Sequence, residues 1–209
     1  RDIAQLMADR VPIRGEAGIG YVLEGGFDMP PLMLTADEIE AAMLGAQWVM
    51  TRADPVLTRA AGDLIAKIGV VIPEHLRPLL MEPALTPLTS HKGPLDTIDM
   101  ARVRTSIRTQ GKIALNYRDE AMRESRRVIW PIAVSYWDAV RLIVAWCELR
   151  KGFRHFRTDR VVSAEFLEQR YPTPRPKLRA QWKKEMEEQW ARELARRARS
   201  TEQSVPMVE

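Results

Sequence analysis

The spacing of apolar and polar positions changes several times along this chain, and each change predicts a different element. Residues 1–8 space their apolar side chains at the intervals of a helix. Residues 11–13 and 19–23 then alternate apolar with polar or small residues, which predicts two short strands joined by a turn at 15–18. The chain should therefore begin with the end of a helix followed by a β-hairpin.

Two capped helices are predicted next. Thr35 and Glu38 have the spacing of a capping box, which predicts a helix to about residue 51. Asp54-Pro55 places an N-cap and a proline at the start of a second helix, which should end at Gly69. The apolar residues that we expect on the inner faces are Ile39, Met43 and Ala46 in the first helix and Val56, Ala60, Leu64 and Ile68 in the second.

Short strands dominate the following part of the chain. A helical piece over 73–81, a short strand over 85–88 and a helix over 97–109 should come first. The expected strands then span 112–118, 126–131, 133–136, 141–149 and 153–161. Such strands with tight connections favour a small, strongly bent barrel, because a barrel leaves no long exposed edges.

A charged helix is expected after this barrel. Residues 166–171 should leave the barrel, and the prolines that follow them break the chain. Residues 178–199 then have helical spacing, with a narrow apolar stripe at Trp182, Met186 and Leu194. We therefore expect an α+β protein. Its parts are the helix end and hairpin (1–25), a helical region (26–94), the barrel (95–171) and a C-terminal helix with its tail (172–209).

Charge separates the front of the chain from the back. Residues 1–100 contain 8 Lys and Arg against 14 Asp and Glu, and residues 101–209 contain 24 against 14. This asymmetry favours an anionic partner for the second half. Within 153–160, aromatic rings alternate with guanidinium groups, which match phosphate and stack on flat rings. The alternative reading is an ordinary solvated basic face.

Signals of catalysis or of a metal are weak. The three histidines lie far apart without metal-ligand spacing, so we expect no metal, no cofactor and no catalytic residue. Cys147 lies in an apolar run, where a buried structural thiol is expected, and this single cysteine fits a reducing cytoplasm. No apolar run approaches the roughly 20 residues that span a bilayer. Because the chain begins with Arg1, we expect that an N-terminal piece precedes it.

Four segments follow one another in the order KIALNY (112–117), SRRVIWP (125–131), VAWCELR (144–150) and FRTDR (156–160). Together these segments resemble the WYL domain of bacterial transcriptional regulators. Residues 1–23 are similar to the end of the recognition helix and the wing of a DeoR-like winged helix-turn-helix, and residues 27–38 to the linker that follows it. One departure stands out, because Arg141-Leu142-Ile143 occupies the place of the Trp-Tyr-Leu triplet that names the family.

The resemblance implies an Sm-like, SH3-type barrel that senses an anionic nucleotide or a single-stranded nucleic acid. Its effector-binding residues would be Tyr117, Arg127, Arg150, Phe156, Arg157 and Arg160. The residues expected at DNA are Arg1 and Arg14. Other roles remain open for the expected effector-binding residues. Tyr117 and Phe156 could pack in the barrel, and Arg127 could pair with Glu124. Arg157 and Arg160 would face opposite sides of a strand unless a turn intervenes.

These inferences together predict a cytoplasmic, DNA-binding transcriptional regulator. It would act as a homodimer on double-stranded operator DNA, with an anionic effector as its second partner and no membrane. The alternative is a module that binds single-stranded DNA or RNA without any regulatory switch. An enzyme acting on nucleotides is a third reading, which the missing catalytic signatures disfavour.

Overall fold

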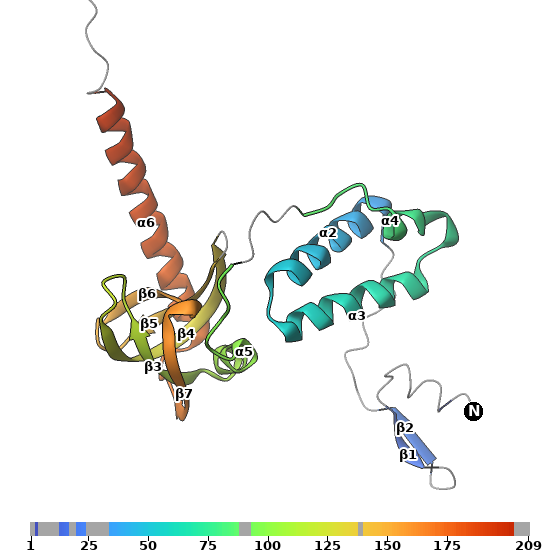
Figure 1. The fold of residues 1–209 in the computed structure, drawn as a ribbon, viewed down its shortest axis with the longest axis horizontal. Helices are drawn as coiled ribbons and strands as arrows, with labels where there is room; N and C mark the ends of the chain where they lie inside the picture. Colours follow the sequence, from blue (N-terminus) through green and yellow to red (C-terminus); the bar gives the residue numbers. More distant parts are fainter. Residues whose placement is uncertain are drawn as a thin grey trace, which may run out of the picture.

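Figure 1 shows the fold of the computed structural model, which combines a small hairpin, a helical unit, and a five-stranded antiparallel sheet with a long C-terminal helix. The expected α+β class is confirmed. The described residues are 3, 13–16, 20–23, 34–87, 93–137 and 140–202. Within these residues, no helix is long and apolar enough to cross a membrane.

The expected hairpin is present. Strands β1 (Ile13–Glu16) and β2 (Gly20–Leu23) pair antiparallel, with Gly15 opposite Tyr21. Gly15 has a φ of +139°, and a Cβ at this position would collide with the carbonyl of Gly20, so only glycine fits here. The turn was expected to begin at residue 15, but residues 15 and 16 belong to β1.

Local capping determines where the first two helices begin. Helix α2 (Ala36–Arg52) starts with the predicted capping box: the Glu38 amide donates to Thr35 Oγ1 (3.3 Å), and the Thr35 amide donates to Glu38 Oε2 (2.8 Å). Asp54 caps α3 (Pro55–Val71) by accepting from the amides of the first turn. The expected inner face of α2, formed by Ile39, Met43 and Ala46, is buried.

The expected inner face of α3 is wrong for three of its four residues. Val56, Ala60 and Leu64 are exposed, whereas Ala61 is buried and Ile65 packs against the core of the helical unit. The reason is that α3 carries apolar residues on more than one face, so periodicity alone does not select the buried one. The helix also continues past the expected end at residue 69, to Val71.

Short helical pieces close the helical unit. They are η1 (Glu74–Leu76) and α4 (Pro78–Met81), which confirm the helical segment expected over 73–81. Leu76, Leu79 and Leu80 pack against the core of α2 and α3. The strand expected at 85–88 is wrong for residues 85–87, which are neither helix nor strand, and residue 88 lies outside the described residues.

The sheet has the order β6-β5-β4-β3-β7, and every neighbouring pair is antiparallel. Helix α5 precedes it. The bounds are α5 (Met100–Thr109), β3 (Gly111–Arg118), β4 (Glu124–Trp137), β5 (Val140–Cys147), β6 (Gly152–Arg157) and β7 (Val161–Arg170).

Three strand predictions need correction. The expected strands 126–131 and 133–136 are one strand, β4, with a register shift between Pro131 and Ala133; proline cannot donate to the ladder and is typical of such a bulge. The expected strand 153–161 is divided by the 3-10 turn η2 (Thr158–Arg160). Residues 166–170 do not leave the sheet, because β7 pairs with β3 along its length.

Both faces of the sheet are covered. On one face α5 packs over Ile113, Leu115, Ile129 and Ile143. On the other face, the start of α6 (Arg175–Glu202) packs through Leu178 and Trp182, against a cluster that includes Trp130, Trp146 and Tyr171. Trp190 and Leu194, further along α6, are exposed. Helix α6 begins at residue 175, earlier than the expected residue 178, and projects away from the sheet (Figure 1).

Candidate functional site

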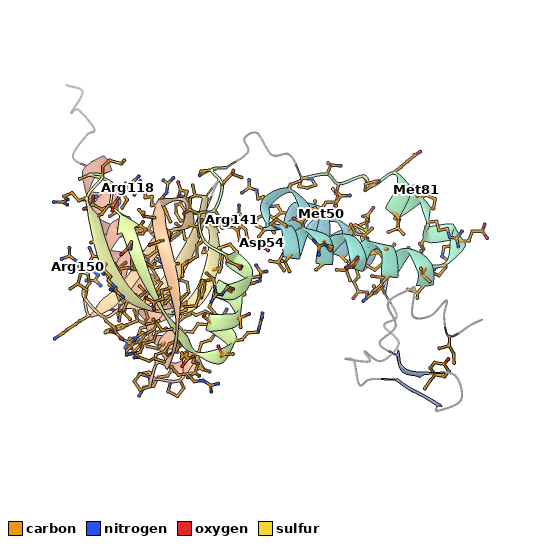
Figure 2. All side chains as sticks on the ribbon, turned by 60° about the horizontal axis from the view of Figure 1, so that its bottom comes forward. Met50, Asp54, Met81, Arg118, Arg141 and Arg150 are labelled. Atoms are coloured by element: carbon orange, nitrogen blue, oxygen red, sulfur yellow. The ribbon has the colours of Figure 1, made fainter. Side chains whose placement is uncertain are left out.

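Four of the six predicted effector-binding residues line one small cavity. This cavity of about 150 Å³ is termed the Arg127 pocket, and its lining is Tyr117, Asp119, Arg127, Cys147, Arg150, Arg154, His155 and Phe156. The register brings them together from β3, β4, β5 and β6: Tyr117 lies opposite Ser125, and Ile143 lies opposite Phe156. Arg150 lies on the side of the sheet domain away from the helical unit (Figure 2).

The Arg127 pocket carries positive charge. Three arginines line it, whereas Asp119 is its only carboxylate among the described residues. Asp119 already accepts from the backbone amide and from Nε of Arg123, both at 3.0 Å, and these bonds lower its pKa. Partial burial lowers the pKa of His155, which disfavours the charged form of this ring. The pocket therefore suits an anion.

Arg127 is incompletely satisfied. Its Nε donates to Ser125 Oγ at 3.0 Å. Its Nη1 is buried and makes no hydrogen bond to any described residue. A buried donor without a partner costs about 1–3 kcal/mol, so such groups usually have a role. An anion in the pocket would supply an acceptor for this nitrogen.

The two aromatic residues of the pocket have different environments. Phe156 is 5% exposed and belongs to the core under α5. Tyr117 is half-buried and meets Phe156 edge-on, with ring centroids 5.2 Å apart. The Tyr117 hydroxyl accepts from the Arg157 amide at 3.2 Å. Of the two rings, Tyr117 is thus the one placed to meet a ligand, and Phe156 supports it.

Arg157 and Arg160 are not in the Arg127 pocket. Arg157 donates through Nε and Nη2 to both oxygens of Asp159, at 3.0 and 2.8 Å. Arg160 lies 3.3 Å from Glu120 and lines a neighbouring cavity of about 390 Å³ whose lining includes the carboxylates of Asp119, Glu120 and Asp159. A turn between the two arginines is present as η2, but both arginines contact acidic residues instead of sharing one pocket. Their contact with an effector stays a prediction.

Sequence reasoning missed four members of the pocket, which are Asp119, Cys147, Arg154 and His155. The difficulty lies in β6, where Phe153 and Phe156 are both buried although they belong to different core clusters. A strand covered on both faces does not show the simple alternation that separates inner from outer residues. The signal that could have found Arg154 is its position beside Phe153 in the same arginine-rich run.

Arg141, which stands at the first position of the family's Trp-Tyr-Leu triplet, has a structural role. Its Nη1 lies 2.9 Å from Oδ2 of Asp96, and both side chains are largely buried. Thr158 adds a hydrogen bond from its hydroxyl to Asp96 Oδ1 at 2.6 Å. These contacts tie the segment before α5 to β5 and η2. Arg141 lies toward the helical unit, on the other side of the sheet domain from Arg150 (Figure 2).

Arg1 lies outside the described residues. Arg14 lies in β1, but its side chain is outside the description. In the described part of the chain, no cluster of three or more His, Cys, Asp or Glu could hold a metal ion.

A polar and aromatic contact joins the helical unit to the sheet. Asp54, the N-cap of α3, is 7% exposed and pairs with both terminal nitrogens of Arg104 on α5; the Nη2–Oδ1 distance is 3.1 Å. Trp48 of α2 meets Tyr136 of β4 edge-on, with ring centroids 5.2 Å apart. Burial alone would raise the pKa of Asp54, but Arg104 and the amides of the first α3 turn outweigh it and lower the pKa.

Asp54→Asn and Asp54→Ala should separate the ion pair from the helix cap. Asparagine caps as well as aspartate, so Asp54→Asn removes only the charge that meets Arg104. Asp54→Ala removes the cap too, and should unfold in urea with about 1 kcal/mol less stability than Asp54→Asn. Because the folded-state pKa of Asp54 is lowered, its charge contributes fully to folding stability above the ordinary pKa of about 4. This contribution is lost as the pH falls through the lowered folded-state pKa. Equal stability of Asp54→Asn and Asp54→Ala would contradict the role of Asp54 as the N-cap of α3.

Residues 99–166 match the family model described as the WYL domain. No curated protein matches the sequence. Among solved structures, one similar protein is the proteasome accessory factor B/C (PafBC) of Arthrobacter aurescens, with 18% sequence identity and a TM-score of 0.34. The match covers 73% of this chain and only 24% of that protein.

The matched range contains α5, the strands β3 to β6 and the first part of β7, together with every residue of the Arg127 pocket. The resemblance to the WYL domain is therefore confirmed over residues 99–166, which are the part of this chain that matches the WYL domain.

Proposed function

We propose that the chain is part of a cytoplasmic DNA-binding transcriptional regulator whose WYL domain senses an anionic nucleotide or a single-stranded nucleic acid in the Arg127 pocket. The observation that carries this proposal is the buried Nη1 of Arg127, which has no hydrogen-bond partner among the described residues and lies in a pocket lined by two further arginines and Tyr117. Arginine forks match phosphate oxygens, and a tyrosine ring can stack on a base.

The size of the pocket favours one part of a longer ligand. Its volume of about 150 Å³ is below the roughly 300–1,000 Å³ typical of cavities that enclose a small molecule. A phosphate group with part of a sugar or base fits, and the rest of the ligand would lie on the surface outside. Arg150 and Arg154 are exposed and can follow such a ligand outward. A single strand meets these conditions better than an enclosed metabolite does.

Sensing requires that the effector bind one arrangement of the protein better than another. The contact of Asp54 with Arg104 and of Trp48 with Tyr136 is the path we propose between the WYL domain and the helical unit. The exposed apolar residues of α3 would then form part of a homodimer interface. They are Val56, Leu64, Val70 and Val71. A dimer fits operator DNA because a two-fold protein reads two half-sites.

Residues 1–25 are proposed to be the end of a winged helix-turn-helix, supported by the hairpin of β1 and β2. The 209-residue chain should bind duplex DNA weakly and without site preference, because the wing mainly contacts the backbone. Arg14→Gln should lower the slope of log affinity against log salt by about one unit. A gel-shift series at several salt concentrations measures this, and an unchanged slope would remove Arg14 from the DNA interface.

A chain extended by a complete helix-turn-helix should bind a selected duplex site specifically, and a short single strand should change that affinity. This experiment distinguishes the regulator from the alternative, a single-strand-binding module without a switch. Operator affinity that is identical with and without the bound strand would favour the module. Specific duplex binding that responds to the strand supports the regulator.

A further inference from the structure

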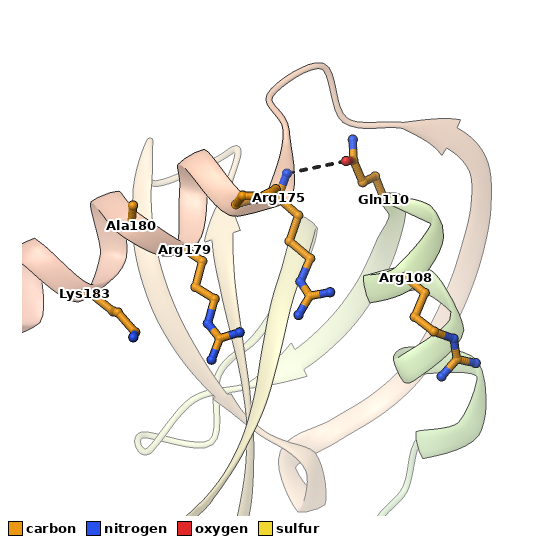
Figure 3. Close-up of a pocket in the computed structure, with 7 residues that line it drawn as sticks. Arg108, Gln110, Arg175, Arg179, Ala180 and Lys183 are labelled. Atoms are coloured by element: carbon orange, nitrogen blue, oxygen red, sulfur yellow. Dashed lines mark hydrogen bonds between the residues drawn. The ribbon is translucent and has the colours of Figure 1, made fainter. Parts of the chain in front are cut away.

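A second basic cavity lies between the C-terminal end of α5 and the first turns of α6 (Figure 3). It has a volume of about 680 Å³ and is termed the α6 cavity. Its lining is Arg108, Gln110, Arg175, Pro176, Arg179, Ala180 and Lys183, none of which lines the Arg127 pocket. The two cavities are therefore separate sites on the same domain.

The basic residues of the α6 cavity share one face of the helix. Arg175, Arg179 and Lys183 are spaced four residues apart, so they lie in a row with about 6 Å of helix axis between neighbours. Figure 3 shows their side chains extending to the same side of α6, and Arg108 on the neighbouring helix α5 lines the same cavity. The row is presented by a helix rather than by a loop, so its spacing is fixed.

The start of α6 is firmly attached to the sheet domain. The Arg175 amide donates to Gln110 Oε1 at 3.4 Å, and Arg175 Nε donates to the Ile132 carbonyl at 3.3 Å. The Tyr171 amide donates to the Gln110 carbonyl at 3.0 Å, and Leu178 is buried in the core. These contacts hold the cations against the domain even though the later part of α6 projects from it.

Among the described residues, no acidic side chain balances the charges of the α6 cavity. No carboxylate of a described residue lines the cavity. Within the described residues, Arg179 and Lys183 form no ion pair, and Arg108 makes only a hydrogen bond to Thr105 (3.0 Å). Like charges four residues apart destabilise a helix by about 0.2–0.5 kcal/mol per pair. A row of cations that weakens its own helix is explained if an anion binds along it.

We propose that the α6 cavity binds adjacent phosphate groups of an oligophosphate chain. Arg108, Arg175, Arg179 and Lys183 would each meet a phosphate oxygen, with the three α6 residues following the chain one helical turn at a time. The chain is either the backbone of a nucleic acid strand or a free linear oligophosphate, which offer the same row of anions. This site is independent of the effector proposed for the Arg127 pocket.

The test uses the whole 209-residue chain with two probes, inorganic tripolyphosphate and a fluorescently labelled short oligothymidylate, each titrated at several salt concentrations. The variant is the double substitution Arg179→Gln and Lys183→Gln. The matched control is Lys184→Gln, because Lys184 is exposed on the same helix but does not line the cavity. The double variant should bind at least one probe about tenfold or more weakly, and its salt slope should fall by about two units. Lys184→Gln should bind nearly as the unsubstituted chain does.

The two probes distinguish the sources of the phosphate chain. Tripolyphosphate that binds and displaces the oligothymidylate shows that linear phosphate suffices, and binding of the oligothymidylate alone assigns the site to a nucleic acid backbone. The proposal fails if neither probe binds, or if the double variant binds both probes as tightly as the unsubstituted chain does. It also fails if Lys184→Gln lowers probe affinity by as much per removed charge as the double variant does.

A second background separates this site from the Arg127 pocket. Arg150→Gln removes an exposed arginine of that pocket, and distant independent sites have additive effects. The double substitution in α6 should therefore cause the same fold-change in the Arg150→Gln background as in the unsubstituted chain. An effect of the double substitution that disappears in this background would contradict a separate site. Circular dichroism confirms that α6 remains helical.

Discussion

Arg141→Ala should lower the free energy of unfolding by about 3–5 kcal/mol, since it leaves the buried carboxylate of Asp96 without its counter-charge. The side chains of Arg141 and Asp96 are only 16% and 11% exposed, so water does not replace the lost partner easily. Urea unfolding at pH 7 measures the loss. Arg123→Ala is the control. The Arg123 side chain is 80% exposed, so its ion pair with Asp119 should contribute only about 0–1 kcal/mol.

The pH dependence of this loss has a defined sign. Burial raises the pKa of Asp96 despite the hydrogen bond from Thr158 and the charge of Arg141. A carboxyl whose folded-state pKa is raised favours the folded state most below its ordinary pKa of about 3.9, and that contribution is lost as the pH rises through the folded-state pKa. Without Arg141 the pKa should rise further, so Arg141→Ala should be least damaging in acid and most damaging at neutral pH.

A second substitution tests the coupling. In the Arg141→Ala background, Asp96→Asn should recover part of the stability at pH 7, because asparagine carries no charge and its Oδ1 can still accept from Thr158. If Asp96→Asn instead causes the same loss in both backgrounds, the two side chains are not coupled. The assignment of Arg141 to the fold would then be wrong.

Phe156→Ala should cost about 3–5 kcal/mol of folding stability, the usual cost when a buried phenylalanine is truncated. The ring is 5% exposed and packs in the core beneath α5, against Tyr117 at an interplanar angle of 89°. Thermal unfolding measures the effect. The matched control is Tyr117→Phe, which retains the ring and removes only the hydroxyl that accepts from the Arg157 amide.

Phe156→Leu separates the role of Phe156 in the core from a role in binding. Leucine keeps an apolar side chain in the core, so the variant should remain folded and bind a single strand with nearly unchanged affinity. A folded Phe156→Leu protein that has lost strand binding would show that Phe156 itself contacts the effector, as the resemblance implied. Unchanged stability of Phe156→Ala would contradict its place in the core.

Features that depend on local chemistry could be predicted from the sequence. The capping box of Thr35 and Glu38 and the N-cap at Asp54 need only neighbouring residues, and both helices begin where expected. The inner face of α3 could not be predicted in this way, because Val56 and Leu64 are as apolar as the residues that pack. Only the position of α2 and α4 decides which face is covered.

Long-range pairing explains the other errors. Strand β7 is defined by its pairing with β3, far earlier in the chain, whereas the prolines after it indicated an end too soon. In the same way, the arginine-rich run predicted the Arg127 pocket only in part. Arg127 and Arg150 converge there. Glu120, the acidic partner of Arg160, comes close only when the strands are assembled, whereas Asp159, the partner of Arg157, is only two residues away in the sequence.

The central proposal is that the Arg127 pocket binds an anionic, nucleic-acid-like effector. The most direct test is a fluorescence titration of a labelled short single strand with the variants Arg127→Gln and Arg150→Gln. Arg126→Gln is the matched control, because Arg126 precedes Arg127 on β4, is 72% exposed at its side chain and does not line the pocket. Arg157→Gln and Arg160→Gln in the same series test the two arginines outside the pocket.

Each pocket variant should weaken strand binding about tenfold or more, which corresponds to the loss of a charge-assisted hydrogen bond, and Arg126→Gln should change it little. Circular dichroism and thermal unfolding confirm that the variants are folded. If Arg127→Gln and Arg150→Gln bind the strand as tightly as Arg126→Gln and the unsubstituted chain do, the Arg127 pocket is not the effector site.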